Sequence, residues 1–180
     1  MAAVKQTALY KRHLEINGNM VPFAGFLLPT YYTSINQEHA AVRKKAGLFD
    51  VSHMGEFIVS GNDSSVFMQK MTVNDVLSLS TGQAQYSAMC YENGGLVDDL
   101  LIYKRDESYL LVVNAANLEK DLQWLEAHVE GQVSIKNVSD KTNLIALQGP
   151  KARKILQPVI DLDLMDLPFY HFMDGQVSDS

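Results

Sequence analysis

The stretch Gln85–Lys104, QYSAMCYENGGLVDDLLIYK, decides how this chain folds, because it predicts two β-strands joined by a tight turn. The Asn-Gly pair at 93–94 is the strongest short hairpin signal, since both central residues of a type I′ turn need a positive φ. The returning strand, Leu96–Tyr103, is apolar except for Asp98 and Asp99. Burying two carboxylates in an apolar strand costs free energy unless hydrogen-bond partners or water compensate the charges, so their presence requires a structural or chemical reason.

Strand alternation places the two acids on opposite faces of the predicted sheet. A two-residue loop at 93–94 or 94–95 puts Tyr86 on the face of Asp99, which also carries Tyr103. The next predicted strand, Ser108–Asn114, follows a polar turn of two or four residues that brings Asn114 opposite Asp99. We therefore expect these four side chains to converge on one face of a three-stranded meander. An odd-length loop would turn one strand over and break the set.

Spacing alone leaves two interpretations of this face open. In the structural interpretation, which the spacing favours, one acid is exposed and the other caps or hydrogen-bonds a neighbouring loop. In the functional interpretation, two tyrosines, an amide and a carboxylate form a site for a flat polar ligand.

Length and composition narrow the class of protein. A chain of 180 residues with a net charge of −6 suits one domain, or one and a half, with a sizeable core. No basic stripe suggests nucleic acid, and the acidity argues against anionic membranes. The N-terminus has no apolar signal region, and no run approaches the length of a membrane span. The one cysteine, Cys90, excludes an internal disulfide framework, and we expect a buried thiol in a cytoplasmic protein.

Helical and strand patterns alternate along the rest of the chain. Apolar spacing and end signals predict helices at Thr7–Ile16, Ile35–Ala46, Asp63–Met71, Ala116–Glu130 and Pro150–Gln157, and further strands at Met20–Ala24, in the second part of Leu48–Ser60, at Gln132–Val138 and at Asn143–Leu147. Ser34 and Gln37 match the pattern of a capping box at the start of the helix Ile35–Ala46. We expect Gly25–Tyr32 to be an irregular apolar segment. Mixed elements of this kind indicate an α+β fold with an antiparallel or mixed sheet.

Motifs for other chemistries are missing from the sequence. The five histidines are scattered without metal-ligand spacing, so we expect no metal site. His53, in the segment DVSHMG, is the histidine with the most suggestive context, although a structural hydrogen bond is the first expectation for it. No glycine-rich phosphate loop is present.

Several segments together resemble the amino-terminal half of aminomethyltransferase, the T-protein of the glycine cleavage system. The matching segments are LYKRH (Leu9–His13), MVPFAGF (Met20–Phe26), P-TYYTSI (Pro29–Ile35), HAAVRKKAGLFDVSHMGE (His39–Glu56), YSAMCYENGGLVDDLLIYK (Tyr86–Lys104), LLVVNAANLEKDLQWL (Leu110–Leu125) and LIALQGPKA (Leu144–Ala152). The combination of FDVSHM and GGLVDDLLIY is a highly specific signature.

The resemblance implies a folate-dependent transferase of one-carbon metabolism and glycine catabolism. The family takes an aminomethyl group from the lipoyl arm of H-protein, releases ammonia and transfers the methylene unit to tetrahydrofolate, without a metal. The second Asp of its GG-x-x-DD segment is the key acid, which corresponds to Asp99. Tyr86, Tyr103 and Asn114 correspond to positions that line the folate, and Met54 to a position in the pocket wall. Asp98 is then structural.

The resemblance extends to about Val159, and the family's chains are about twice this length. We therefore expect a folate-binding region at residues 1–160 and the acidic start of a further part at residues 161–180. Aromatic residues at Phe169–Phe172 would favour self-association of an isolated half. The alternatives are a non-enzymatic folate-binding relative that acts as a sensor or assembly factor, and a demethylase-type folate domain.

Overall fold

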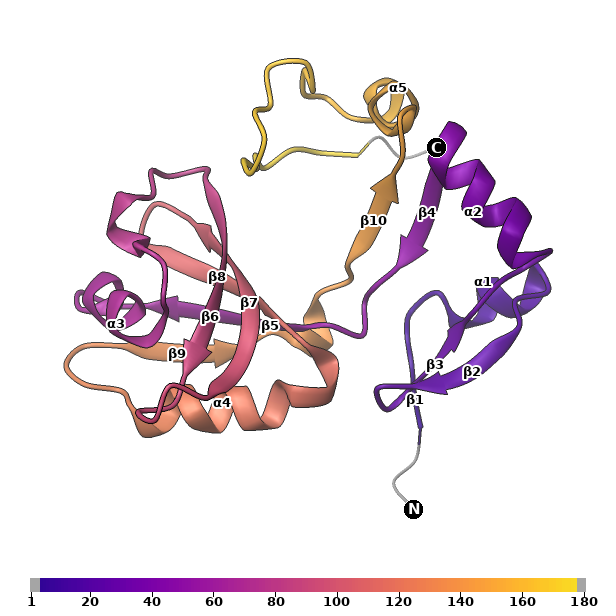
Figure 1. Cartoon of the computed structure of the whole chain (residues 1–180). Helices are drawn as coiled ribbons and strands as arrows, with labels where there is room; N and C mark the ends of the chain where they lie inside the picture. Colours follow the sequence, from indigo (N-terminus) through magenta and orange to yellow (C-terminus); the bar gives the residue numbers. More distant parts are fainter. Residues whose placement is uncertain (1–3, 178–180) are drawn as a thin grey trace. The chain divides into compact units, whose positions relative to one another are not determined.

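The chain folds into two compact units, each of which is described by itself. The computed structural model describes residues 4–177. The first unit contains residues 4–53, 143–166 and 174–177, and the second contains residues 54–142 and 167–173 (Figure 1). Both units combine helices with mostly antiparallel strands, so the predicted α+β class is confirmed.

The second unit is built on a five-stranded antiparallel sheet with the strand order β6-β7-β8-β5-β9. Its strands are β5 (Gly55–Ser60), β6 (Ala84–Cys90), β7 (Leu96–Lys104), β8 (Ser108–Val113) and β9 (Ser134–Asn137), and its helices are α3 (Ser64–Met71) and α4 (Leu118–Ala127), with short 3-10 turns η1 (Val76–Ser78), η2 (Ala115–Asn117) and η3 (Ser139–Lys141). The meander β6-β7-β8 is the one that the sequence predicts.

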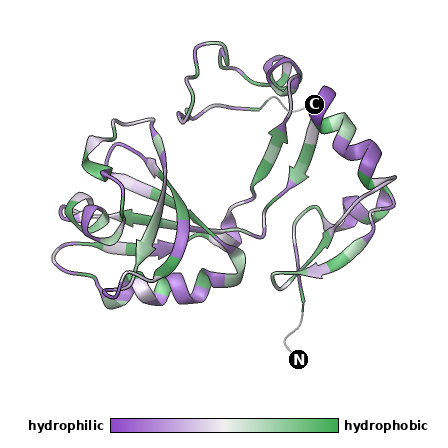
Figure 2. Cartoon of the chain, viewed as in Figure 1, coloured by the Kyte–Doolittle hydropathy of each residue, from purple (hydrophilic) through white to green (hydrophobic). Residues whose placement is uncertain are grey.

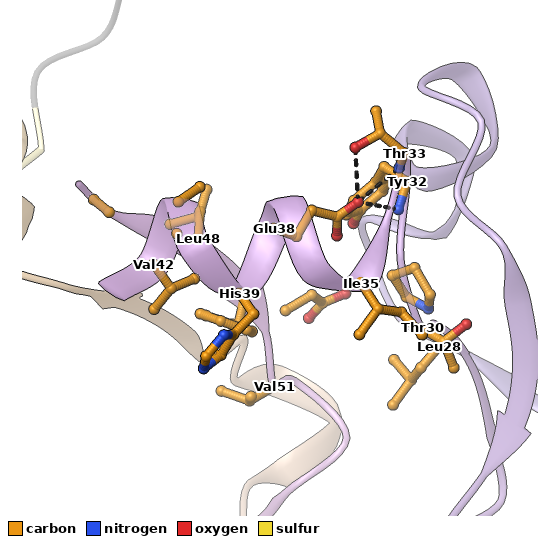
Figure 3. A pocket seen from close by; sticks show the side chains of 16 residues that line it. Leu28, Thr30, Tyr32, Thr33, Ile35, Glu38, His39, Val42, Leu48 and Val51 are labelled. Carbon is orange, nitrogen blue, oxygen red and sulfur yellow. Dashed lines mark hydrogen bonds between the residues drawn. The ribbon is translucent and has the colours of Figure 1, made fainter. Parts of the chain in front are cut away.

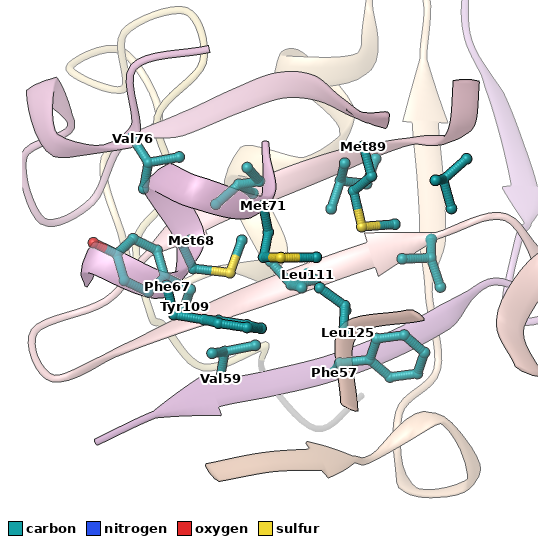
Figure 4. Close-up of a cluster of buried hydrophobic side chains, with 14 residues drawn as sticks. Phe57, Val59, Phe67, Met68, Met71, Val76, Met89, Tyr109, Leu111 and Leu125 are labelled. Carbon is teal, nitrogen blue, oxygen red and sulfur yellow. The ribbon is translucent and has the colours of Figure 1, made fainter. Parts of the chain in front are cut away.

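The hydrophobic core of this unit lies between one face of the sheet and helices α3 and α4. Phe57 of β5 and Leu111 of β8 are fully buried there with Met68 of α3 and Leu125 of α4 (Figure 4). Hydrophilic and hydrophobic residues alternate along α4, as expected for a helix with one buried face (Figure 2). Because side chains alternate along each strand, the opposite face of the sheet carries Tyr86, Asp99 and their neighbours.

The β6–β7 hairpin differs from the predicted type I′ turn. The Gly94 N–H donates to the Tyr91 carbonyl at 2.9 Å, and the Tyr91 N–H donates to the Gly95 carbonyl at 2.8 Å. Gly94 has a φ of 82° and Asn93 has no positive φ, so the loop is three residues long with glycine in the left-handed position. A register shift beside Cys90 leaves Val97 without an opposite residue.

Cys90 is exposed, so the prediction of a buried thiol is wrong. The β7–β8 pairing begins at Leu100, whereas the β6–β7 pairing continues to Cys90 and Leu96. The hairpin therefore extends beyond the third strand, and its end is solvated.

The first unit contains a three-stranded sheet of order β1-β3-β2, a separate strand pair β10-β4 and three helices. Its elements are β1 (Lys5–Gln6), β2 (Met20–Phe23), β3 (Phe26–Pro29), β4 (Gly47–Asp50), β10 (Ile145–Gln148), α1 (Tyr10–Glu15), α2 (Ile35–Lys44), α5 (Ala152–Leu156) and the 3-10 turn η4 (Gln157–Val159). The expectation of an irregular Gly25–Tyr32 is wrong, because a turn with positive φ at Ala24 and Gly25 folds β3 back onto β2.

The predicted capping box at the start of α2 is also wrong. Ser34 makes no side-chain capping bond. Instead Glu38 Oε1 accepts the backbone N–H groups of Tyr32 and Thr33 at 2.8 and 2.6 Å (Figure 3). It also accepts the backbone N–H of Ser34 at 3.2 Å. A carboxylate at this end is favoured by the helix dipole, and it accepts three backbone N–H groups and the Thr33 hydroxyl, where a serine hydroxyl would cap a single N–H.

Candidate functional site

The Asp99 carboxylate is the centre of the predicted site, and side chains from both neighbouring strands bind it. The Tyr86 hydroxyl donates a hydrogen bond to Asp99 Oδ2 from β6. Asn114, directly after β8, donates from Nδ2 to Asp99 Oδ1 at 2.8 Å. The structure therefore brings these three residues together on the face that strand alternation predicts.

These hydrogen bonds set the protonation states in the site. The bond from Tyr86 is the largest influence on the Asp99 carboxyl, and with the bond from Asn114 it holds the pKa of Asp99 below its ordinary value. The same bond raises the pKa of the Tyr86 hydroxyl. At neutral pH the site thus presents an ionised carboxylate beside a protonated phenol. Tyr86 is 53% exposed, so this pair is accessible to a ligand.

Tyr103 and Met54, the other two predicted residues, make no hydrogen bond to the Asp99 carboxylate among the described residues. Tyr103 lies on the same face of β7 as Asp99, two residues after Leu101. Its ring contacts that of Phe172, with the ring centroids 5.5 Å apart. Burial raises the pKa of the Tyr103 hydroxyl. Met54 precedes β5, and continuing the β5–β8 register places it opposite Asn114.

Tyr170 is a neighbour of the site that the sequence analysis did not select. The segment around it runs along the free edge of β6, where the Ala84 N–H donates to the Tyr170 carbonyl at 2.7 Å and the Phe172 N–H donates to the Gly82 carbonyl at 2.8 Å. Electrostatic repulsion from Tyr170 contributes to the raised pKa values of both Tyr86 and Tyr103. Aromatic residues after Pro168 were the available signal. Phe172 has a packing partner here, whereas Phe169 is 88% exposed.

Two further buried acids near the site were also missed. Glu56 of β5 lies on the face of Asp99, is 1% exposed, and has no hydrogen-bond partner for either carboxyl oxygen within the described chain. Its burial raises the pKa of Glu56 to about 7. Asp121 of α4 is completely buried on the other face, behind Asp98. The sequence signal for Asp121 was its position three residues after Leu118, within the apolar stripe of the helix.

The first unit has a separate cavity of about 640 Å³ that contains none of the predicted residues. It is lined mainly by apolar side chains of β3, α2 and β4, among them Leu28, Ile35 and Val42 (Figure 3). Beside it, Asp50 accepts hydrogen bonds from Thr7 at 2.6 Å and from His13 at 2.9 Å. These bonds tie α1 to β4.

His53 does not make the structural hydrogen bond expected first. Its ring makes edge contacts with Phe23 and Phe26, at centroid distances of 5.6 and 6.3 Å, and within residues 4–177 its Nδ1 is buried without a hydrogen-bond partner. Burial lowers the pKa of His53, so the neutral ring is favoured.

Neither a metal cluster nor a membrane helix emerges from the described residues. Within 4–177, no group of three or more His, Cys, Asp or Glu side chains is arranged to hold a metal ion. In the same range no helix combines the length and the apolar composition needed to cross a bilayer.

Comparison with known proteins gives consistent matches over nearly the whole chain. The family model described as "GCVT N-terminal domain" matches residues 9–180. The chain is 52% identical over 172 residues to the aminomethyltransferase of Bacillus licheniformis, which covers 95% of this chain and 47% of that protein. It is 51% identical over 176 residues to the aminomethyltransferase of Halalkalibacterium halodurans, with 97% and 48% covered.

A solved structure shows the same fold. The glycine cleavage system aminomethyltransferase T from Bartonella henselae superposes with a TM-score of 0.87 at 31% identity, over 93% of this chain and 46% of that one. The chain thus spans about half the length of the relatives it matches.

Proposed function

This chain belongs to the aminomethyltransferase (T-protein) family of the glycine cleavage system, and we propose that it takes part in transferring a methylene unit from the aminomethyl-lipoyl arm of H-protein to tetrahydrofolate. In this reaction the C–S and C–N bonds of the aminomethyl thioether break, and the carbon forms bonds to two folate nitrogens. Sulfur and nitrogen each keep the electron pair of the bond that breaks. Each also takes up one of the two protons that the folate nitrogens lose, so the products are a thiol and ammonia. The reaction involves no net oxidation.

The observation that carries the proposal is the ionised Asp99 carboxylate, which is fixed by Tyr86 and Asn114 on an accessible face. A fixed negative charge stabilises the cationic, iminium-like carbon that develops as ammonia leaves. The same carboxylate can accept a hydrogen bond from a folate N–H and orient that nitrogen for attack. Because its position is set before the ligand arrives, little reorganisation is needed during the reaction.

The aromatic residues around Asp99 suit a flat heterocycle. Tyr86 binds the carboxylate, Tyr103 lies on the same face of β7, and Tyr170 interacts electrostatically with both tyrosines from the edge of β6. Rings of this kind bind planar ligands through their faces and edges. We assign Met54 to the wall of this pocket, as its position beside Asn114 suggests.

Substitution of Asp99 tests the proposal. The tetrahydrofolate affinity of the chain is measured directly, and the transfer rate is measured with aminomethylated, lipoylated H-protein. Asp99→Asn should reduce the rate far more than the affinity, because the charge acts on the transition state. Tyr86→Ala should weaken binding. Asp106→Asn, in the exposed β7–β8 turn, is the matched control. Equal losses of rate and affinity in Asp99→Asn would contradict the assigned role.

A second candidate is a folate-binding relative without transfer activity, acting as a sensor or assembly factor, in which the Asp99 face would bind the ligand without catalysing transfer. Saturable tetrahydrofolate binding without transfer, even with H-protein supplied, would support it. The cytoplasmic location, the acidic start of a further part at residues 161–180 and self-association through Phe169–Phe172 remain predictions from the sequence.

A further inference from the structure

Two acids lie back to back beneath the Asp99 site, in the interface between β7 and α4. Asp98 is 6% exposed and Asp121 is 0% exposed. In the described residues, neither oxygen of Asp121 and only one oxygen of Asp98 has a hydrogen-bond partner. An unpaired buried carboxylate is strongly disfavoured, and two adjacent ones more so.

The surrounding charges do not neutralise this pair. Lys120 is the cation beside Asp121, but its Nζ lies 3.9 Å from Asp121 Oδ1 and its side chain is 42% exposed. The Lys120 ammonium donates its hydrogen bond to the Val97 carbonyl instead. Burial, Asp98 and Asp99 together outweigh Lys120 and raise the pKa of Asp121 to about 8. At neutral pH Asp121 therefore retains its proton.

One amide connects the buried acids to the site. Asn114 Nδ2 lies 2.8 Å from Asp99 Oδ1 and 3.2 Å from Asp98 Oδ1. An amide nitrogen has two hydrogens, so it can donate one bond to each carboxylate. Asp98 and Asp99 thus hold the Asn114 amide from two sides, although their side chains leave the strand on opposite faces.

We propose that Asp121 is a positioning residue of the Asp99 site, which shares one proton with Asp98 and thereby fixes the Asn114 amide that binds Asp99. The protonated Asp121 is the donor for the Asp98 oxygen that has no other partner. Asp98 in turn accepts from Asn114, and Asn114 orients the carboxylate that acts in transfer. The part of this inference that concerns transfer rests on the proposed function, whereas the proton and its hydrogen-bond chain do not.

Ionisation of Asp121 should disturb this chain of bonds. Without the proton, Asp98 and Asp121 repel each other, with Asp99 of β7 adding to the repulsion and Lys120 of α4 opposing it. The Asp98 oxygens then move relative to Asn114, and the Asn114–Asp99 bond loses its second support. The site is therefore expected to be well ordered below about pH 8 and looser above it.

Carboxyl carbon NMR of the folded chain measures the proton directly. Asp121 should titrate with a midpoint near pH 8, and the side-chain amide signals of Asn114 should move with the same midpoint. Asp121→Asn keeps a neutral donor and should abolish that step, and Asp98→Asn should lower the Asp121 midpoint. Glu119→Gln, on the exposed side of α4, is the control and should change neither. An Asp121 already ionised at neutral pH, or Asn114 signals that ignore its titration, would overturn the proposal.

The effect on function is read from the same variants. Asp121→Asn keeps a donor for Asp98 and should lose the decline of the transfer rate that the unaltered chain shows on the alkaline side. Asp121→Ala, which removes the donor, should lower the transfer rate by about tenfold or more with a smaller change in affinity. If Asp121→Ala fails to fold, the pH profile of Asp121→Asn decides. If the transfer rate of Asp121→Asn still declines on the alkaline side as in the unaltered chain, the positioning role is contradicted. If the unaltered chain does not bind folate, the proposed function is contradicted, but the NMR test of the shared proton remains valid.

Discussion

The Tyr86 hydroxyl binds the Asp99 carboxylate diagonally across the β6–β7 pair, because Tyr86 pairs with Leu101 and Asp99 pairs with Ala88. Diagonal neighbours in an antiparallel pair are within reach of a tyrosine side chain. Asn114 binds the other carboxylate oxygen from the opposite side. The carboxylate is thus held from both adjacent strands, which fixes its orientation more firmly than either bond alone could.

Removing the Tyr86 hydroxyl should raise the pKa of Asp99 towards its ordinary value, because this hydrogen bond is the largest cause of the lowered value. Tyr86→Phe is the suitable change, and carboxyl carbon NMR of Asp99 is the measurement. Tyr103→Phe is the control, since Tyr103 is not among the causes of the Asp99 shift. An Asp99 midpoint that stays in place in Tyr86→Phe would show that the bond does not control ionisation.

The buried Glu56 should make the stability of the second unit depend on pH. Its folded pKa of about 7 lies above the value expected in the unfolded chain, so the folded state binds the extra proton between those two values. Stability then falls by about 1.4 kcal/mol per pH unit as the pH rises from about 4 to about 7, and this contribution is fully lost above that range. Glu56→Gln should remove the slope and stabilise the unit at neutral and alkaline pH.

Urea unfolding followed by the fluorescence of Trp124, the one tryptophan of the chain, measures this effect. Asp121 adds a slope of the same sign, so the difference between the unaltered chain and Glu56→Gln is the informative quantity. Glu92→Gln, in the exposed hairpin loop, is the control. If the free energy of unfolding changes with pH in the same way for Glu56→Gln and the unaltered chain, Glu56 binds no extra proton on folding and is ionised in the folded state at neutral pH.

The sequence analysis predicted correctly that Tyr86 and Asp99 share one face of the sheet, but it assumed a two-residue turn that the structure does not contain. The loop between Tyr91 and Gly95 has an odd number of residues, which alone would have turned Tyr86 away from Asp99. The unpaired Val97 adds a second displacement of one residue, and the two cancel. Alternation therefore gave the right face because hydrophobic burial of the other face, with Met89 and Leu100, enforces the register.

The depth at which the two acids are buried could not be predicted from periodicity. Asp121 occupies a position within the apolar stripe of α4, where a pattern indicates the direction of a side chain and not the depth to which it is covered. Glu56 alternates correctly along β5, yet its face is usually the solvated one in an antiparallel sheet. In both cases tertiary packing decides the burial, and only the structure reveals it.

The start of α2 should depend on Glu38 and not on Ser34. Glu38→Ala removes the acceptor of three backbone N–H groups and should destabilise the first unit by about 1 kcal/mol, as loss of a helix cap does. Ser34→Ala should cost little, since its hydroxyl makes no capping bond. Amide hydrogen exchange at the first turn of α2 measures both effects. Faster exchange in Ser34→Ala than in Glu38→Ala would support the capping box instead.

Gly94 should be the most sensitive position of the β6–β7 loop. Its φ of 82° is strained for any residue with a Cβ, although a Cβ there would meet no atom within 4 Å. Gly94→Ala should therefore destabilise the second unit by about 1 kcal/mol for purely conformational reasons. Gly94→Asn should cost less, because asparagine tolerates the left-handed region better than alanine does.

Trp124 fluorescence in urea reports this change as well, since the Trp124 ring lies 5.0 Å from that of Tyr91 at the base of the loop. A type I′ turn centred on 93–94 would also require a positive φ at Asn93, so under that geometry Asn93→Ala would be as costly as Gly94→Ala. In the observed loop Asn93 has no positive φ, and Asn93→Ala loses only the bond from the Gly95 N–H to Asn93 Oδ1. A clearly larger cost for Gly94→Ala than for Asn93→Ala therefore supports the three-residue loop, and equal costs would restore the two-residue turn.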